Sequence, residues 1–161
     1  MKLPWRRRGD PQVRVAALIE RYRASDQAFF LMQFSEDVRP SWPPRQVTGL
    51  TVSSWVDALR ITHVNDRYLD LYAFPRGRSP VGWSLDHLTG SRTAAIRLLV
   101  EFYAIGGLSQ VELMRHRQDG HLMKLRGEYQ ILTHGRRVIG HYGLEDDVTI
   151  DLIGPKPTGV N

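Results

Sequence analysis

The 161-residue chain has no cysteine, only three lysines, and no long uninterrupted run of apolar residues. Without thiols, a disulfide framework, a thiolate metal cluster and a cysteine nucleophile are excluded. A membrane-spanning helix would need an apolar run of about 20 residues, so that class is excluded as well. The basic start has no apolar segment behind it, which predicts no secretory signal. We therefore expect a cytoplasmic or intravirion protein, with or without membrane association.

The net charge of +5 is concentrated at the start of the chain. Residues 1–23 contain seven cations and two anions, and the remaining 138 residues contain fifteen of each sign. An arm of this kind binds phosphate or an anionic lipid surface, and a single tryptophan beside the cations favours lipid. A solvated arm without a partner is the alternative. The candidate residues for anionic-surface binding are Lys2, Trp5, Arg6, Arg7, Arg8, Arg14, Arg21, Arg23, Arg76 and Arg78.

Helical spacing of apolar residues predicts helices at two places. Asp10 followed by Pro11 is typical of a helix start, and the spacing predicts a helix over about 11–24. A central helix over about 92–105 is predicted to begin after Ser91 and to end at a glycine pair. A shorter helix is expected where Ser54 precedes Asp57 by three residues, the spacing of a capping box.

Extended segments are predicted mainly in the second half. Residues 68–74 and 81–85 flank a Gly/Pro turn and predict a hairpin, and a second hairpin is predicted around Asp119-Gly120. Strands are also expected at 129–133 and 136–139, joined by a turn at His134-Gly135 as a further hairpin, and at 148–153. Residues 28–34 are a buried strand or a continuation of the first helix, which the pattern does not distinguish.

These segments predict an α+β fold, with a mostly antiparallel or mixed sheet packed on the central helix. We expect a basic arm over 1–10, one globular domain over 11–154 and a tail over 155–161. Three prolines predict a hinge at 35–46, in which Trp42 packs on the body.

Catalytic signatures are missing from the sequence. It contains no phosphate-binding glycine loop, nucleophile elbow or zinc-protease motif. His116, Asp119 and His121 could form a metal site. The preferred interpretation is that these histidines, like His134 and His141 beside the last strands, are ordinary polar residues of exposed hairpin ends. The acidic triplet 145–147 is likewise interpreted as a solvated turn. We expect no enzyme and no cofactor.

Residues 68–153 resemble the ubiquitin-like β-grasp family. The order hairpin, helix, strands is similar, and residues 139–153 are similar to that family's closing turn and last strand. The chain departs from the family in the extra Asp119-Gly120 hairpin and in having Thr158-Gly159-Val160-Asn161 where the family ends in diglycine. The resemblance implies a protein-interaction module.

The whole layout also resembles the matrix proteins of rhabdoviruses. It shares a basic start, a proline-rich segment and Gly90-Ser91-Arg92 before a central helix, but it lacks the tyrosine of that family's Pro-Pro-x-Tyr motif and the C-terminal helix. We therefore expect a binding protein whose arm docks on an anionic membrane leaflet while its neutral body contacts proteins and self-associates. The alternatives are a nucleic-acid-binding protein and a ubiquitin-like module.

Overall fold

The computed structural model describes residues 9–149, and their framework is a five-stranded antiparallel sheet with the strand order β2-β1-β5-β4-β3. The first and last strands in sequence, β1 and β5, are therefore neighbours in the middle of the sheet. The strands are β1 (Ala28–Phe34), β2 (Leu59–Val64), β3 (Leu108–His116), β4 (Leu122–His134) and β5 (Arg137–Asp147).

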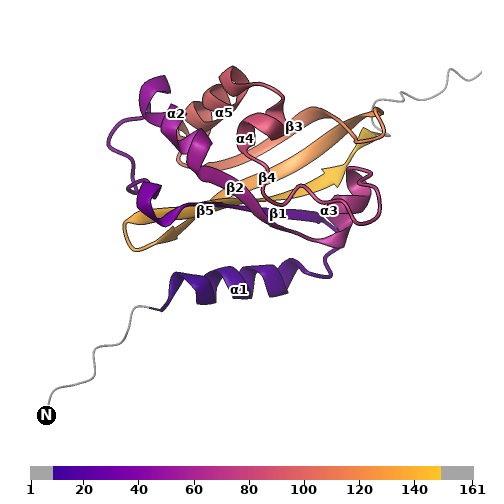
Figure 1. Cartoon of the computed structure of the whole chain (residues 1–161), viewed down its shortest axis with the longest axis horizontal. Coiled ribbons are helices and arrows are strands. Elements are labelled where there is room, and N and C mark those ends of the chain that lie inside the picture. The colour runs from indigo at the N-terminus through magenta and orange to yellow at the C-terminus, as the bar shows by residue number, and fades with distance from the viewer. Residues whose placement is uncertain (1–8, 150–161) are drawn as a thin grey trace, which may run out of the picture.

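Helices cover both faces of the sheet (Figure 1). The helices are α1 (Pro11–Tyr22), α2 (Gly49–Ala58), α3 (Asp66–Leu71), α4 (Leu85–Thr89) and α5 (Arg92–Ala104), with a 3-10 turn η1 (Glu36–Val38). Helix α1 lies alone under one face, and α2, α4 and α5 lie over the other. The α+β class and the antiparallel sheet agree with the sequence prediction.

The main core lies between the sheet and α2, α4 and α5. Leu99 and Tyr103 of α5 and Val56 of α2 pack there against Met32 and Ile61 of the sheet, all nearly inaccessible to solvent. On the opposite face, α1 places Val15 against Phe29, Leu31 and Ile139. This second core is smaller, because Val15 is the one residue of α1 that is fully buried.

Local capping explains where the helices begin. The Asp10 carboxylate accepts a hydrogen bond from the Gln12 amide at 2.9 Å, and the Ser91 hydroxyl accepts one from the Ala94 amide at 3.3 Å. For α2 the cap is Thr48, which exchanges hydrogen bonds with Thr51. The capping box expected at Ser54 is wrong, since Ser54 lies inside α2 and donates back to the Thr51 carbonyl.

The predicted hairpin over 68–85 is wrong. Residues 68–71 belong to α3, because the Asn65 side chain caps that helix and Tyr68, Leu71 and Tyr72 then fall on one buried helical face. Leu85 begins α4, and Ser84 forms only an isolated bridge with Arg60 of β2. The strand β2 itself is absent from the sequence prediction, since its residues follow α2 without a turn signal.

The predicted closing strand over 148–153 is also misplaced. Strand β5 ends at Asp147, and Val148 and Thr149 lie outside it, while residues 150–153 lie outside the described part of the chain. The whole acidic triplet therefore lies within a strand, and Glu145 is only 4% exposed. The interpretation of this triplet as a solvated turn is wrong, because pairing with Ala28 and Gly127 places Glu145 over the core.

Two strand pairings confirm the predicted hairpins of the second half. Strands β3 and β4 pair around Asp119-Gly120, and β4 pairs with β5 around Gly135. The proline-rich segment also packs on the body as expected, with the Trp42 ring 6.0 Å from that of Tyr103. No helix within residues 9–149 combines the length and the apolar character needed to cross a membrane.

Candidate functional site

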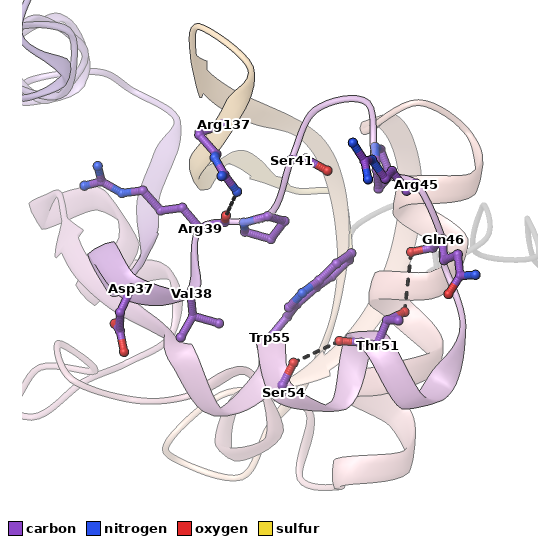
Figure 2. A pocket seen from close by; sticks show the side chains of 12 residues that line it. Asp37, Val38, Arg39, Ser41, Arg45, Gln46, Thr51, Ser54, Trp55 and Arg137 are labelled. Carbon is purple, nitrogen blue, oxygen red and sulfur yellow. Dashed lines mark hydrogen bonds between the residues drawn. The ribbon is translucent and has the colours of Figure 1, made fainter.

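An open pocket of about 600 Å³ lies where the proline-rich segment passes over α2 and the start of β5 (Figure 2). Its walls come from four parts of the chain that are brought together only by folding. They are η1, residues 39–46, α2 and Arg137 of β5. The lining residues are Asp37, Val38, Arg39, Pro40, Ser41, Pro44, Arg45, Gln46, Thr51, Ser54, Trp55 and Arg137.

Backbone pairing holds the proline-rich wall of the pocket against β5. The Val138 amide donates to the Pro40 carbonyl at 2.8 Å, and the Trp42 amide donates to the Arg136 carbonyl at 2.9 Å. Ser41 forms a bridge with Arg137 between these bonds. Prolines at 40, 43 and 44 remove donors that a regular strand would need, so the segment pairs briefly and then leaves the sheet.

Trp55 forms the base of the pocket. It is half-buried, and its ring packs on Tyr103 of α5 with centroids 4.9 Å apart. Figure 2 places it between α2 and the loop that carries Ser41 and Arg45. The pocket therefore has an aromatic surface supported by the main core.

The three arginines of the pocket differ in the hydrogen bonds and ion pairs that they make. Arg137 donates from Nη1 to the Arg39 carbonyl at 3.2 Å. Arg39 lies 3.7 Å from Glu36, and its guanidinium points away from Arg45, while its Nε is buried without a hydrogen-bond partner (Figure 2). Arg45 is exposed and makes no hydrogen bond or ion pair with another residue of the described range 9–149. The surface beside Arg45 is therefore cationic and uncompensated.

A second cavity, of about 260 Å³, lies between the C-terminal part of α1 and the end of β2. It is lined by apolar groups of Ile19 and Phe29 and by His63, whose pKa is lowered by partial burial. The Asn65 side chain at its edge already makes four hydrogen bonds. This cavity offers less room and fewer available polar groups than the pocket beside Arg45.

A carboxyl group and an imidazole are buried in the interior. Glu145 accepts hydrogen bonds from the hydroxyls of Tyr72 at 2.8 Å and Tyr129 at 2.7 Å. Burial raises its pKa, which the two hydroxyls partly oppose. His141 pairs its Nε2 with the Tyr103 hydroxyl at 2.8 Å, and burial lowers its pKa to about 3. The interpretation of His141 as a residue of an exposed hairpin end is wrong, because it faces the core from the middle of β5.

The described residues include no cluster of three or more histidine, aspartate or glutamate side chains that could hold a metal ion. At the β3–β4 turn, the His121 Nδ1 lies 3.2 Å from Asp119, which also lies 3.3 Å from Arg117. These contacts are those of an ordinary polar turn.

The cations predicted to bind an anionic surface do not share one face. Arg14 donates to the Thr133 carbonyl, Arg21 lies over the Tyr22 ring, and Arg23 lies 3.6 Å from Glu20. The other two described candidates, Arg76 and Arg78, are exposed on the loop that joins α3 to α4, separate from α1. The remaining candidates, Lys2, Trp5, Arg6, Arg7 and Arg8, lie outside the described residues.

The residues that do come together, Arg45, Trp55 and Arg137, are absent from the sequence prediction. A cation on each side of the proline cluster, Arg39 and Arg45, is a local signal. Their partners on α2 and β5 are not visible without the fold.

Comparison with solved structures finds PAS and LOV domains as neighbours of this fold, in which the sheet has the order β2-β1-β5-β4-β3 and α2, α4 and α5 lie on one face. The PAS domain of a protein from Colwellia psychrerythraea matches with a TM-score of 0.57 and 13% identity, over 84% of this chain and 98% of that chain. An RNA-binding light-oxygen-voltage receptor matches with a TM-score of 0.58 and 16% identity. That match covers 94% of this chain, which spans only 38% of the receptor.

A light-oxygen-voltage domain studied with a flavin analogue matches with a TM-score of 0.58 and 16% identity, over 84% of this chain and 87% of that chain. No family model matches this sequence, and no curated protein resembles it significantly in sequence. At these identities the likeness shows the fold alone.

These comparisons overturn the two resemblances inferred from the sequence. The β-grasp interpretation of 68–153 is wrong, since its first hairpin is helical and the structural neighbours are PAS and LOV domains. The resemblance to rhabdovirus matrix proteins, with a viral protein docking on a membrane leaflet, is wrong for the same reason. Both rested on element order, which does not determine how strands pair.

A flavin does not fit the interior of this chain. The space between the sheet and α5 is filled by Phe34, Phe102, Tyr103 and His141, each at most 9% exposed. Ring centroids in this group lie 5.1 to 5.5 Å from that of His141, the separation of packed rings. A flavin ring system would have to displace them, and a close-packed core offers no such room. The chain also has no cysteine that could bond to a flavin.

Proposed function

We propose that this chain is a PAS-type sensory module that works through protein–protein contacts and has no catalytic activity of its own. The observation that carries the proposal is the strand order β2-β1-β5-β4-β3 with α2, α4 and α5 on one face. The match with the Colwellia psychrerythraea PAS domain, which covers 98% of that domain, supports it.

The placement of the acid–base groups supports a non-enzymatic role. Glu145 and His141 are 4% and 7% exposed, and neither lines the two pockets described above. A general acid or base must reach its substrate within hydrogen-bond distance, which burial prevents here.

The exposed side of β3 and β4 is the surface we assign to self-association. Helix α1 covers the neighbouring strands, but Met114 and Leu122 on the same face are 45% and 51% exposed. Glu112 lies between Lys124, at 2.6 Å, and Arg126, at 3.2 Å. A face that carries apolar groups and both signs of charge can pair with its own copy about a twofold axis.

Sedimentation velocity of the full chain tests this role over about 10 to 200 µM, the range that reveals micromolar association. We expect a concentration-dependent dimer, and a monomer for the Met114→Glu, Leu122→Glu double variant. Val81→Glu is the matched control, because Val81 is also exposed, at 52%, but lies on the loop between α3 and α4 and not on β3 or β4. A wild-type chain that stays monomeric throughout contradicts the proposed self-association.

A further inference from the structure

The uncompensated positive charge around the pocket is greater than its lining alone suggests. Arg136 adjoins Arg137 on the β4–β5 turn, and Arg14 reaches the same end of the sheet through its bond to the Thr133 carbonyl. The lining contains Arg39, Arg45 and Arg137 against the single carboxylate of Asp37. Arg39 already lies 3.7 Å from Glu36, so the excess charge is that of Arg45 and Arg137. Figure 2 places Asp37 on the side of the pocket away from Arg45.

The pocket combines two kinds of binding group in one place. Trp55 presents an aromatic ring, and tryptophan rings stack with planar bases. Arg45 and Arg137 present guanidinium groups, whose planar forks match the oxygens of phosphate. Neither group by itself specifies a ligand, but a molecule that joins a planar ring to phosphate would use both.

The size of the pocket suits such a molecule. Pockets for small ligands and cofactors have volumes of about 300 to 1,000 Å³, and this one has about 600 Å³. It is open on one side, so a charged phosphate group could remain partly hydrated at Arg45 while the ring lay on Trp55.

We propose that this pocket binds a nucleotide, with the base stacked on Trp55 and the phosphates held by Arg45 and Arg137. The site lies outside the space between the sheet and α5, which is filled by side chains. The proposal deepens the proposed sensory function, on which it rests, by naming the chemical class of the signal.

Titration calorimetry of the full chain with ADP and ATP tests the proposal. Adenosine serves as the ligand without phosphate, and pyrophosphate as the ligand without a base. We expect ADP or ATP to bind at least about tenfold more tightly than either part alone, since both sets of contacts must be made together. If ADP and ATP give no heat of binding at about 5 mM, the proposal is overturned, because a specific site should bind its ligand with a dissociation constant below the millimolar range.

Variants locate the binding site. Arg45→Gln should weaken ADP binding by about tenfold or more, the loss expected for a charge-assisted pair. Trp55→Phe, which retains an aromatic ring against Tyr103, should weaken ADP but leave pyrophosphate unchanged. Arg76→Gln is the matched control, an exposed arginine that does not line the pocket, with the same change in net charge. Equal losses for Arg45→Gln and Arg76→Gln mean that binding follows net charge, which overturns the site.

Two further outcomes separate this proposal from others. If a short single-stranded RNA binds more tightly than ADP and Arg45→Gln leaves its affinity unchanged, the basic surface serves RNA and the nucleotide pocket is overturned. If ADP binds as expected but the chain never self-associates, the site stands and the proposed interaction role fails. Circular dichroism of each variant excludes unfolding as the cause of a loss.

Discussion

Asn65 joins α1, β1 and α3 through every polar atom of its side chain. Its Oδ1 accepts hydrogen bonds from the amides of Phe29 and Tyr68, and its Nδ2 donates to the carbonyls of Tyr22 and Gln27, all at 2.9 Å. The residue is 6% exposed. A buried side-chain amide whose hydrogen bonds are all satisfied specifies one arrangement of the segments that it connects. Local sequence indicates only a cap here, because most of these partners lie far along the chain.

His141 makes the stability of the fold depend on pH. Its pKa is lowered by burial to about 3, so the folded chain keeps the ring neutral, whereas the unfolded chain takes up a proton below about 6.5. The unfolded state then binds more protons in this range, and stability falls as pH falls. We expect about 2 kcal/mol to be lost between pH 7 and pH 5 through this group.

The measurement is urea unfolding at both pH values for the wild type and for His141→Asn. The variant removes the titrating ring, so the difference between the two chains should shrink toward low pH. His63 and the other histidines contribute equally to both chains and cancel. An unchanged difference from pH 7 to pH 5 contradicts the assignment.

At the scale of elements, the pairing of β1 with β5 depends on a glycine. A Cβ at Gly140 would collide with the carbonyl oxygen of Met32, which is backbone and cannot rotate away. Gly140 pairs with Gln33 at this point, so relief would require the two central strands to separate. The close approach of β1 and β5 therefore requires that this position have no side chain.

We expect Gly140→Ala to destabilise the fold by about 2–3 kcal/mol, the cost of overpacking a site that cannot relax. Gly49→Ala is the matched control, because its added Cβ would lie 3.8 Å from Ile96, an ordinary contact, at the first position of α2. Helix propensity should make that variant neutral or more stable by about 0.5 kcal/mol. Thermal or urea unfolding measures the change in stability for each variant. An equal change for Gly140→Ala and Gly49→Ala contradicts the steric explanation.

At the scale of the whole molecule, the two faces of the sheet are unequally covered. Three helices and the proline-rich segment pack on one face, while α1 buries one residue completely on the other. The nucleotide pocket and the exposed face of β3 and β4 are thus on separate parts of the same sheet. Strand β5 contributes Arg137 to the pocket and pairs with β4, so it connects the two regions.

Self-association predicts that thermal stability depends on protein concentration. Unfolding of a dimer releases two chains, so Tm should rise by about 2 °C for each tenfold increase in concentration for a chain of this size. Differential scanning calorimetry at two concentrations measures this shift. The Met114→Glu, Leu122→Glu variant should show no shift, and a wild-type Tm independent of concentration counts against the dimer.

Local spacing and capping were enough to predict α1, the helix that begins after Ser91, and the turns at Asp119-Gly120 and Gly135. These features depend on residues within a few positions of one another, such as a side chain that accepts a bond from an amide two or three residues on. They also sufficed for the α+β class.

Strand order, the helical state of 68–71 and the binding pocket were decided only by tertiary structure. Tyr68 and Tyr72 alternate with polar or smaller residues in a way that suits a strand or a helix, and the Asn65 cap with its distant partners selects the helix. Glu145 and His141 look like surface residues in the sequence, but β5 lies at the centre of the sheet, so both are buried. The pocket joins Arg45, Trp55 and Arg137 from separate elements, and no pattern along the chain encodes which elements meet.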